Sequence, residues 1–191
     1  MKEITRIIAT VSILLICGAI YILGAEESGV VIGQPAPQLM LRDLNGKMVF
    51  LADFCGGKCP LAMRKNVVVH FFATHCKPCE TELPALKRLT ETFPEQELVI
   101  LMVSVSEMEA VVMNYRDQKA LNAIFLLDKF GANATRWGLA GKKGDSTIFN
   151  LPYNFVIDKD GILKAVFPGA HPNLDKLVTA KLKVTPPASN R

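Results

Sequence analysis

Two cysteines, Cys76 and Cys79, stand between an apolar run and a segment with helical periodicity. The apolar run is residues 67–72, and the helical pattern follows from residue 82. The pair is therefore expected where a buried strand ends and a helix begins. A thiol at a helix N-terminus faces unpaired N–H groups and the positive end of the helix dipole, which favour the thiolate. With a second thiol in disulfide reach, this placement predicts thiol–disulfide exchange: one thiolate attacks a substrate disulfide and the other resolves the mixed disulfide.

Two other interpretations of this pair are weaker. Half of a zinc site would need a second Cys-x-x-Cys or a His-x3-His pair, and none follows downstream. A plain structural disulfide would not explain the placement between a strand and a helix. Redox chemistry is therefore the favoured interpretation.

The N-terminus predicts export from the cytoplasm. Lys2 and Arg6 precede residues 7–25, an uncharged and mostly apolar stretch of 19 residues, close to the ~20 that a helix needs to cross a bilayer. The positive flank orients such a segment with its N-terminus inside and the remainder outside, where disulfides persist. We expect residues 1–25 to be retained as a signal anchor. Cleavage after Ala25 and lipidation at Cys17 are the alternatives.

The remainder divides into a linker, residues 26–32, one domain, residues 33–185, and a tail, residues 186–191. A length of 191 residues suits one domain plus an extension. The net charge of +4 includes no dense run of Lys or Arg. We therefore expect no nucleic-acid partner.

Cys55 and Cys59 form a second pair, in a loop marked by Gly56, Gly57 and Pro60. In an exported protein a local disulfide is the simplest interpretation, although closing so short a loop adds little stability. A second redox pair and a copper site are the alternatives. The pair precedes the strand, which at ~3.3 Å per residue spans about 20 Å. The two cysteine pairs are therefore expected near opposite ends of the sheet, without direct electron exchange.

Glu82 shares one helical stripe with Leu86, Leu89 and Phe93. The stripe is expected to face the core, one turn beyond Cys79. A desolvated carboxyl there has a raised pKa and can pass protons to and from the Cys79 thiol. The alternative is a Glu82 side chain that points into solvent.

The other elements follow from periodicity and turn signals. Residues 38–42 and 47–51 predict a hairpin around Asn45-Gly46. His70 is expected to be a satisfied core residue, Pro84 is expected to kink the helix at 80–93, and Ser106 with Glu109 resembles a capping box. Polar residues 140–149 are expected to form a surface loop. Further strands are expected at 98–105, 125–127, 151–157 and 162–167, and further helices at 106–119, 131–137 and from Asn173.

This order of elements resembles the thioredoxin fold. Three stretches resemble the TlpA/ResA branch of exported, membrane-tethered thiol–disulfide oxidoreductases: residues 33–37 with the hairpin after them, residues 71–84 and residues 151–158. The resemblance spans residues 33–167. It implies an α/β protein with a thioredoxin-like three-layer α/β/α fold, an N-terminal β-hairpin and an N-terminal membrane-anchor helix.

The resemblance also implies roles. Pro152 matches the cis-proline of the family, which faces the disulfide and helps to bind the substrate chain, and Glu82 matches its active-site glutamate. Some members reduce the cysteines of apocytochromes c during cytochrome c biogenesis, with electrons from a membrane thiol transporter. The cysteine pair is itself the redox group, so no cofactor and no metal are expected.

The chain departs from the family pattern in three places. His75 stands where a Trp usually precedes the first cysteine, and its ring can stabilise the Cys76 thiolate. Cys55 and Cys59 are additional, and residues 140–149 lengthen the stretch before Pro152. These departures leave the substrate open.

Together these features predict an extracytoplasmic or periplasmic thiol–disulfide oxidoreductase, tethered to the cytoplasmic membrane, that reduces protein disulfides. Cys76 is the attacking thiolate, Cys79 resolves, Glu82 handles protons and Pro152 shapes the substrate groove.

Two other functions compete with this prediction. A thiol peroxidase usually has Thr three residues before its cysteine, whereas Thr74 lies two before Cys76. A copper-binding chaperone would use Cys55 and Cys59.

Overall fold

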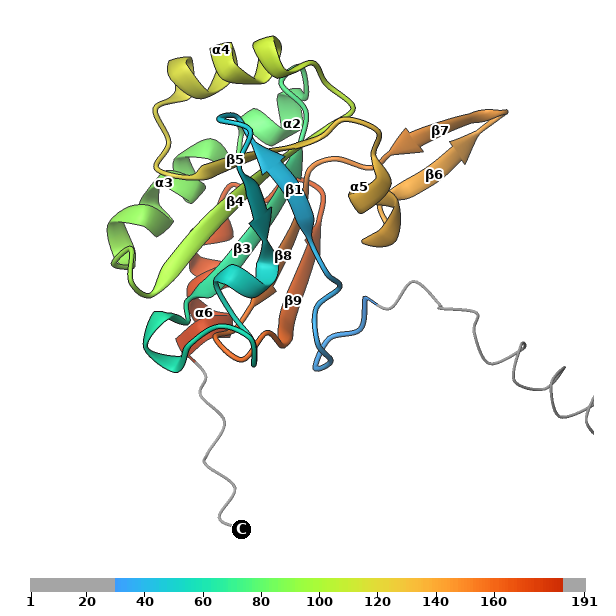
Figure 1. The fold of residues 1–191 in the computed structure, drawn as a ribbon. Coiled ribbons are helices and arrows are strands. Elements are labelled where there is room, and N and C mark those ends of the chain that lie inside the picture. Colours follow the sequence, from blue (N-terminus) through green and yellow to red (C-terminus); the bar gives the residue numbers. More distant parts are fainter. Residues whose placement is uncertain (1–29, 184–191) are drawn as a thin grey trace, which may run out of the picture.

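An inner strand of the sheet, β3, is the apolar run that ends just before Cys76 and Cys79. The computed structural model describes residues 30–183 (Figure 1). All residues of β3 (Asn66–Phe72) except the first are buried, because both faces of the strand are covered. On one side β3 pairs in parallel with β4 (Leu98–Val105), and on the other it pairs antiparallel with β8 (Tyr153–Ile157).

Within residues 30–183, seven strands form one mixed sheet in the order β2-β1-β5-β4-β3-β8-β9. The three inner strands β3, β4 and β5 are mutually parallel, and the flanking strands run antiparallel to them. The predicted N-terminal hairpin is confirmed as the pair β1–β2. The remaining strands of this sheet are β1 (Met40–Asp43), β2 (Met48–Phe50), β5 (Ile124–Asp128) and β9 (Leu163–Pro168).

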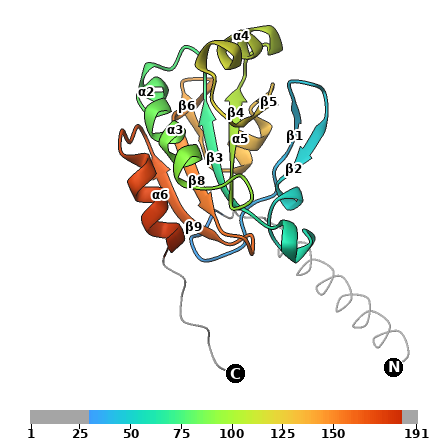
Figure 2. The ribbon, with the colours of Figure 1, turned by 90° about the vertical axis from the view of Figure 1, so that its left-hand side faces the viewer.

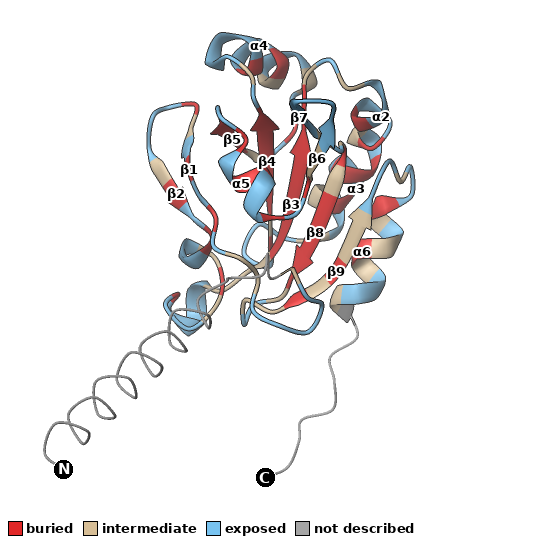
Figure 3. Ribbon diagram, turned by 90° about the vertical axis from the view of Figure 1, so that its right-hand side faces the viewer, coloured by how far each residue is buried: buried red, intermediate tan, exposed pale blue. Residues whose placement is uncertain are grey.

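Helices cover both faces of the sheet (Figure 2). They are α2 (Lys77–Glu80), α3 (Leu83–Thr92), α4 (Glu109–Lys119), α5 (Ala132–Arg136) and α6 (Leu174–Lys183), with 3₁₀ helices at Leu51–Asp53 and Leu61–Met63. One core packs α3, α4 and α6 against Phe72, and the other packs α5 and Trp137 against Phe71. Alternate residues of β3 thus supply opposite cores, and Figure 3 shows the inner strands as the most buried part. The thioredoxin-like α/β arrangement is confirmed.

The predicted kinked helix at 80–93 is two helices. The first, α2, ends at Glu80, and α3 begins at Leu83 with Glu82 as its N-cap. Pro84 therefore lies in the first turn of α3, where its missing N–H loses no hydrogen bond. The proline marks the start of a helix and does not bend one.

Residues 140–149, predicted as a loop, form an antiparallel hairpin of β6 (Ala140–Lys143) and β7 (Ser146–Phe149) that projects from the domain (Figure 1). Gly144 has a φ of +60°, the left-handed conformation that a two-residue hairpin turn requires. Most residues of both strands are exposed. Because neither face is buried, the sequence carries no alternation of apolar and polar residues to predict the strands.

The predicted capping box at Ser106 and Glu109 is wrong. The N-cap of α4 is Met108, and it makes no side-chain capping bond. Ser106 instead follows β4 with a positive φ of 58°. A four-residue sequence match therefore does not define the start of this helix.

The predicted membrane segment, residues 1–25, and the tail, residues 186–191, lie outside the described residues. Within residues 30–183, no helix has the length and apolar character needed to cross a membrane. The boundaries of the domain at 33 and 185 stay predictions.

The first testable prediction concerns the base of the β6–β7 hairpin. An alanine Cβ at Gly131 (φ +66°) would lie 2.7 Å from Cε2 of Phe149, whereas one at Gly138 (φ +80°) would meet nothing within 4 Å. Both substitutions strain the backbone, but only Gly131→Ala displaces the ring. We expect Gly131→Ala to lower the free energy of unfolding by about 1–3 kcal/mol more than Gly138→Ala. Urea unfolding of both variants measures the difference, and equal losses would contradict this packing role.

Candidate active site

Cys76 and Cys79 form a disulfide at the end of β3, with their Cα atoms 5.3 Å apart. Cys76 is the N-cap of α2, and the backbone N–H of Cys79 donates a hydrogen bond to Cys76 Sγ at 3.2 Å. The predicted order of strand, cysteine pair and helix is therefore confirmed. Cys76 is partly exposed, whereas Cys79 is 1% exposed. An external partner must meet Cys76 first.

The Glu82 side chain is fully buried, as its helical stripe predicted. Both carboxyl oxygens accept hydrogen bonds of 3.1 Å from Asn154 Nδ2, and Oε1 also accepts the backbone N–H of His171 at 2.7 Å. Burial raises the pKa of Glu82, and these hydrogen bonds act in the opposite direction. The site thus holds a buried carboxyl, three residues beyond Cys79, that can exist in both protonation states.

His70 contacts the same group of residues. Its Nδ1 lies 2.7 Å from Asn154 Oδ1 and 3.4 Å from Glu82 Oε2. Burial lowers the pKa of His70 to about 4, although the hydrogen bond with Asn154 opposes this shift. The prediction of a satisfied core residue is only half right, because Nε2 is buried and has no hydrogen-bond partner among the described residues.

Pro152 lies beside the end of β3. The register pairs Tyr153 with Phe71. Pro152 therefore lies next to the C-terminal end of β3, from which the loop to the disulfide begins. The Leu151–Pro152 peptide bond is cis, as the resemblance implied. Pro152 is buried, and its carbonyl accepts the N–H of Gly169 at 2.9 Å.

Glu107 is a site residue that the sequence analysis did not identify. Its nearly buried carboxylate accepts hydrogen bonds from Thr74 N–H at 2.9 and 3.0 Å, Thr74 Oγ1 at 2.6 Å and Ser104 Oγ at 2.6 Å. His75 Nδ1 lies 3.4 Å from the same carboxylate, with its ring 84% exposed beside Cys76. Glu107 therefore anchors the loop that carries the reactive cysteine. The sequence did contain a signal for this role, since Glu107 lies just beyond β4. Parallel neighbouring strands have their C-terminal ends at the same end of the sheet, so a residue after β4 lies near the loop after β3.

Cys55 and Cys59 lie at the opposite end of β3, as expected. The loop that carries them is held by a hydrogen bond of 3.0 Å from Gly56 N–H to the carbonyl of Lys159, in the turn after β8. The predicted disulfide between them is wrong, since both are buried free thiols. Burial raises the pKa of Cys55 to about 12, with Asp158 and Cys59 adding to the effect.

The described residues around Cys55 and Cys59 do not form a metal-binding site. In the part of the chain that the structure describes, no three His, Cys, Asp or Glu side chains gather in a way that could hold a metal ion. A copper site at Cys55 and Cys59 would therefore have no third protein ligand among the described residues.

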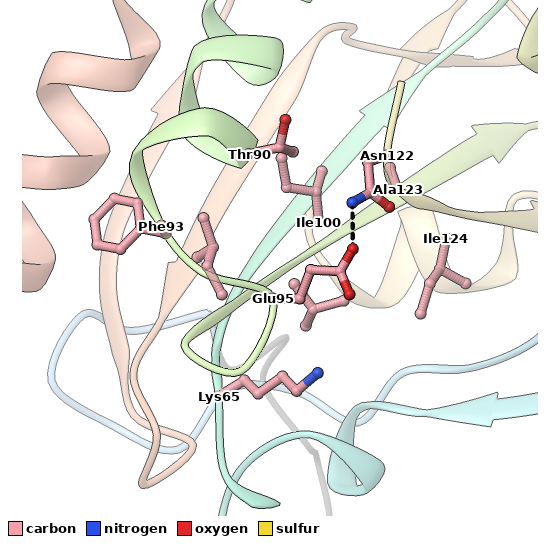
Figure 4. Close-up of a pocket in the computed structure, with 10 residues that line it drawn as sticks. Lys65, Thr90, Phe93, Glu95, Ile100, Asn122, Ala123 and Ile124 are labelled. Carbon is pink, nitrogen blue, oxygen red and sulfur yellow. Dashed lines mark hydrogen bonds between the residues drawn. The ribbon is translucent and has the colours of Figure 1, made fainter. Parts of the chain in front are cut away.

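A cavity of about 190 Å³ lies at the end of the sheet that is opposite the disulfide (Figure 4). Lys65, Glu95 and Asn122 line it, and Asn122 Nδ2 donates to Glu95 Oε1 at 2.7 Å. The cavity lies at the N-terminal ends of β3, β4 and β5, whereas the cysteine pair follows the C-terminal end of β3. The cavity is therefore separate from the candidate active site.

Comparison with known proteins gives a consistent result. Residues 32–166 match the model of the AhpC/TSA family. The thiol-disulfide oxidoreductase ResA of Bacillus thuringiensis subsp. konkukian is 30% identical over 168 residues, covering 84% of this chain and 86% of that protein. ResA of Geobacillus thermodenitrificans is 30% identical over 175 residues, covering 88% and 91%.

Solved structures share the fold. A thiol:disulfide interchange protein of the thioredoxin family from Chlorobium tepidum TLS has a TM-score of 0.58 at 24% identity, covering 79% of this chain and 97% of that one. Peroxidoxin BcpB from Mycobacterium tuberculosis has a TM-score of 0.66 at 18% identity, covering 81% and 98%. Oxidoreductases and a peroxidoxin thus share this architecture, so the fold alone does not separate the two activities.

The pKa of Glu82 leads to a prediction about stability. Because the folded chain holds this proton more tightly than the unfolded chain, stability is highest below the ordinary pKa of 4.5 and falls as pH rises through the raised folded value. Glu82→Gln cannot titrate. We expect it to have a higher Tm than the wild type at pH 8, with the difference vanishing near pH 4. Thermal unfolding of the oxidised proteins across this range checks the result, and a wild type that is more stable at pH 8 would contradict it.

Proposed function

Because the chain belongs to the AhpC/TSA family and resembles the ResA thiol–disulfide oxidoreductases over most of its length, we propose that it is an exported, membrane-tethered reductant of protein disulfides. The enzyme class, thiol–disulfide oxidoreductase, follows from these relatives. The observation that carries the proposed reaction is the unequal exposure of the two thiols at the end of β3: Cys76 is partly exposed and Cys79 is buried.

The proposed reaction begins at Cys76. Its thiolate attacks a substrate disulfide, which forms a mixed disulfide and releases one substrate sulfur as a thiolate that takes a proton from water. Cys79 then gives its proton to the Glu82 carboxylate, and the Cys79 thiolate attacks Cys76 Sγ. This step forms the Cys76–Cys79 disulfide and releases the second substrate sulfur. Two electrons have passed to the substrate, and a membrane thiol-transfer protein would return them to the pair.

The neighbours of the pair are assigned supporting roles. Pro152, at the same edge of the sheet, would contact the bound substrate chain. His75 places an imidazole ring beside Cys76, and Glu107 holds the loop after β3 that carries both residues. A positive or hydrogen-bonding group beside a thiolate favours the charged form.

The proposed location rests on the N-terminal sequence. Residues 7–25 are long and apolar enough for a single span after a positive flank, which would hold the domain at the outer face of the cytoplasmic membrane. The TlpA/ResA resemblance supports the cysteines of apocytochromes c as one candidate substrate.

The end of the sheet that carries Cys76 also presents exposed apolar side chains. Met108 and Phe130 follow β4 and β5 at the edge where β3 ends, and they are 75% and 91% exposed. Large apolar side chains in the open are typical of surfaces that contact other chains. We therefore expect unfolded or extended protein segments to be better substrates than small disulfides.

The roles of the two cysteines can be separated by substitution. We expect Cys76→Ser to reduce insulin disulfides no faster than the uncatalysed reaction, and Cys79→Ala to accumulate mixed disulfides because resolution is lost. Cys55→Ala, at the far end of the sheet, is the control and should keep the wild-type rate. A Cys76→Ser variant with normal reductase activity would sink the proposal.

The same variants test the competing function and the location. Rapid turnover of hydrogen peroxide by a wild type that leaves insulin disulfides intact would favour a thiol peroxidase. The proteins that Cys79→Ala traps in cells identify the substrates, and recovery of cytoplasmic proteins alone would contradict export.

The exposed side chain of Phe130 gives a further prediction. We expect Phe130→Ser to lower kcat/KM for a protein disulfide by about fivefold or more, the effect of losing one well-buried interface side chain, and to leave a small disulfide unaffected. Leu61→Ser is the matched control, because Leu61 is 78% exposed and precedes β3 at the opposite edge. Equal losses in the two variants would show that Phe130 has no special part in substrate binding.

A further inference from the structure

Three polar side chains meet inside the core beside the cysteine pair. His70 in β3 and Asn154 in β8 are partners in the strand register, and Glu82 lies at the start of α3. All three have relative exposures of 0%. A buried polar group without hydrogen-bond partners destabilises a fold, so the way these three satisfy one another determines which protonation states the core accepts.

In the observed arrangement every hydrogen bond runs toward the carboxylate. The amide oxygen of Asn154 only accepts, so the Nδ1 of His70, 2.7 Å away, must carry the proton. The Asn154 amide nitrogen then donates to both oxygens of Glu82, and the backbone N–H of His171 donates to Oε1. This set of donors suits an ionised Glu82.

A protonated Glu82 requires the chain of bonds to reverse. The carboxyl O–H must then find an acceptor, either Asn154 Oδ1 after rotation of the amide or His70 Nδ1, which lies 3.4 Å from Oε2. In both cases Nδ1 accepts a hydrogen bond, so the imidazole proton moves to Nε2. Neutral histidine has two such tautomers, and Nε2 has no hydrogen-bond partner among residues 30–183 to hold it in one of them.

We infer that His70 is a positioning residue that reverses its tautomer so that Glu82 can take up and release the Cys79 proton inside the core. The inference rests on the proposed role of Glu82. In the resolving step the proton leaves Cys79 Sγ and binds the Glu82 carboxylate, and the Asn154 amide rotates. A water molecule that enters the cluster accepts the proton of His70 Nδ1 and returns one to Nε2, and the Cys79 thiolate attacks Cys76 Sγ and releases the substrate sulfur. When Glu82 returns its proton, the three side chains resume the observed arrangement, and His70 neither gains nor loses a proton overall.

The surroundings of Glu82 contain few other groups that titrate. Cys79 precedes it by three residues, His70 faces it from β3, and His171 faces it from the loop after β9 through a backbone N–H. The His171 ring is directed to the carbonyl of Pro168, 3.1 Å from Nε2. Asn154, from β8, is uncharged. Burial raises the pKa of Glu82 and lowers that of His70 to about 4, so a neutral imidazole faces the carboxyl over the working pH range.

The first test measures the rate at which Cys79 resolves a mixed disulfide, as a function of pH. His70→Leu removes the donor that supports the ionised state, so we expect the rising limb of the profile to move up by about one pH unit. His70→Asn keeps an amide that can donate or accept near the Nδ1 position, so its profile should stay close to the wild type. Met102→Leu is the control: Met102 is the register partner of His70 in β4 and belongs to the core beside it, and its profile should not move.

The second test needs no variant of His70. In the full chain, ¹⁵N NMR of the His70 ring should show a proton on Nδ1 while Glu82 is ionised and on Nε2 once Glu82 is protonated. In Glu82→Gln the same ring should keep one tautomer at every pH above its own titration. A wild-type His70 that keeps one tautomer from pH 5 to 9 overturns the inference, as does an unshifted profile in His70→Leu.

The outcomes also separate this inference from the proposed function. If Glu82→Gln resolves mixed disulfides at the wild-type rate, Glu82 has no role as a proton carrier and the proposed mechanism is wrong. If Glu82→Gln is slow but His70→Leu keeps the wild-type pH profile, the proposed mechanism stands and only the role of His70 is wrong.

Discussion

The pairing of β3 with β4 and β8 positions every part of the candidate site. The strand is buried on both faces, and its end delivers the loop that carries Cys76. Pairing with β8 brings Pro152 to the same end of the sheet. Pairing with β4 brings Glu107 to the loop after β3, where it binds Thr74. A shift of one residue in this register would turn His70 away from Glu82 and into the opposite core, so the site and the sheet cannot be specified independently.

The buried polar cluster shows why the core departs from an apolar pattern at this point. His70, Glu82 and Asn154 replace apolar contacts with hydrogen bonds, which offset the cost of burial only while all three are present. A carboxyl in such a place has its protonation tuned by its neighbours, and that property suits a group that serves a buried thiol. Departures from the packing rule are expected where chemistry requires them.

The two cysteine pairs differ because their surroundings differ. Cys76 lies at a helix start with a backbone N–H directed at its sulfur, and it is open to partners. Cys55 is buried, and burial holds its pKa near 12, which keeps the thiol protonated and unreactive. Two similar sequence motifs at the two ends of one strand therefore have different reactivity.

The sequence by itself determined the junction of strand, cysteine pair and helix, the N-terminal hairpin and the buried face of Glu82, because each follows from local periodicity and turn chemistry. Only the tertiary structure decided that Asn154 joins His70 and Glu82, from which it is separated by 84 and 72 residues. It also decided that Glu107 holds Thr74, that Cys55 and Cys59 are free thiols, and that residues 140–149 pair as strands. The physical reason is that these contacts depend on strand order and register, which bring together residues that share no local pattern.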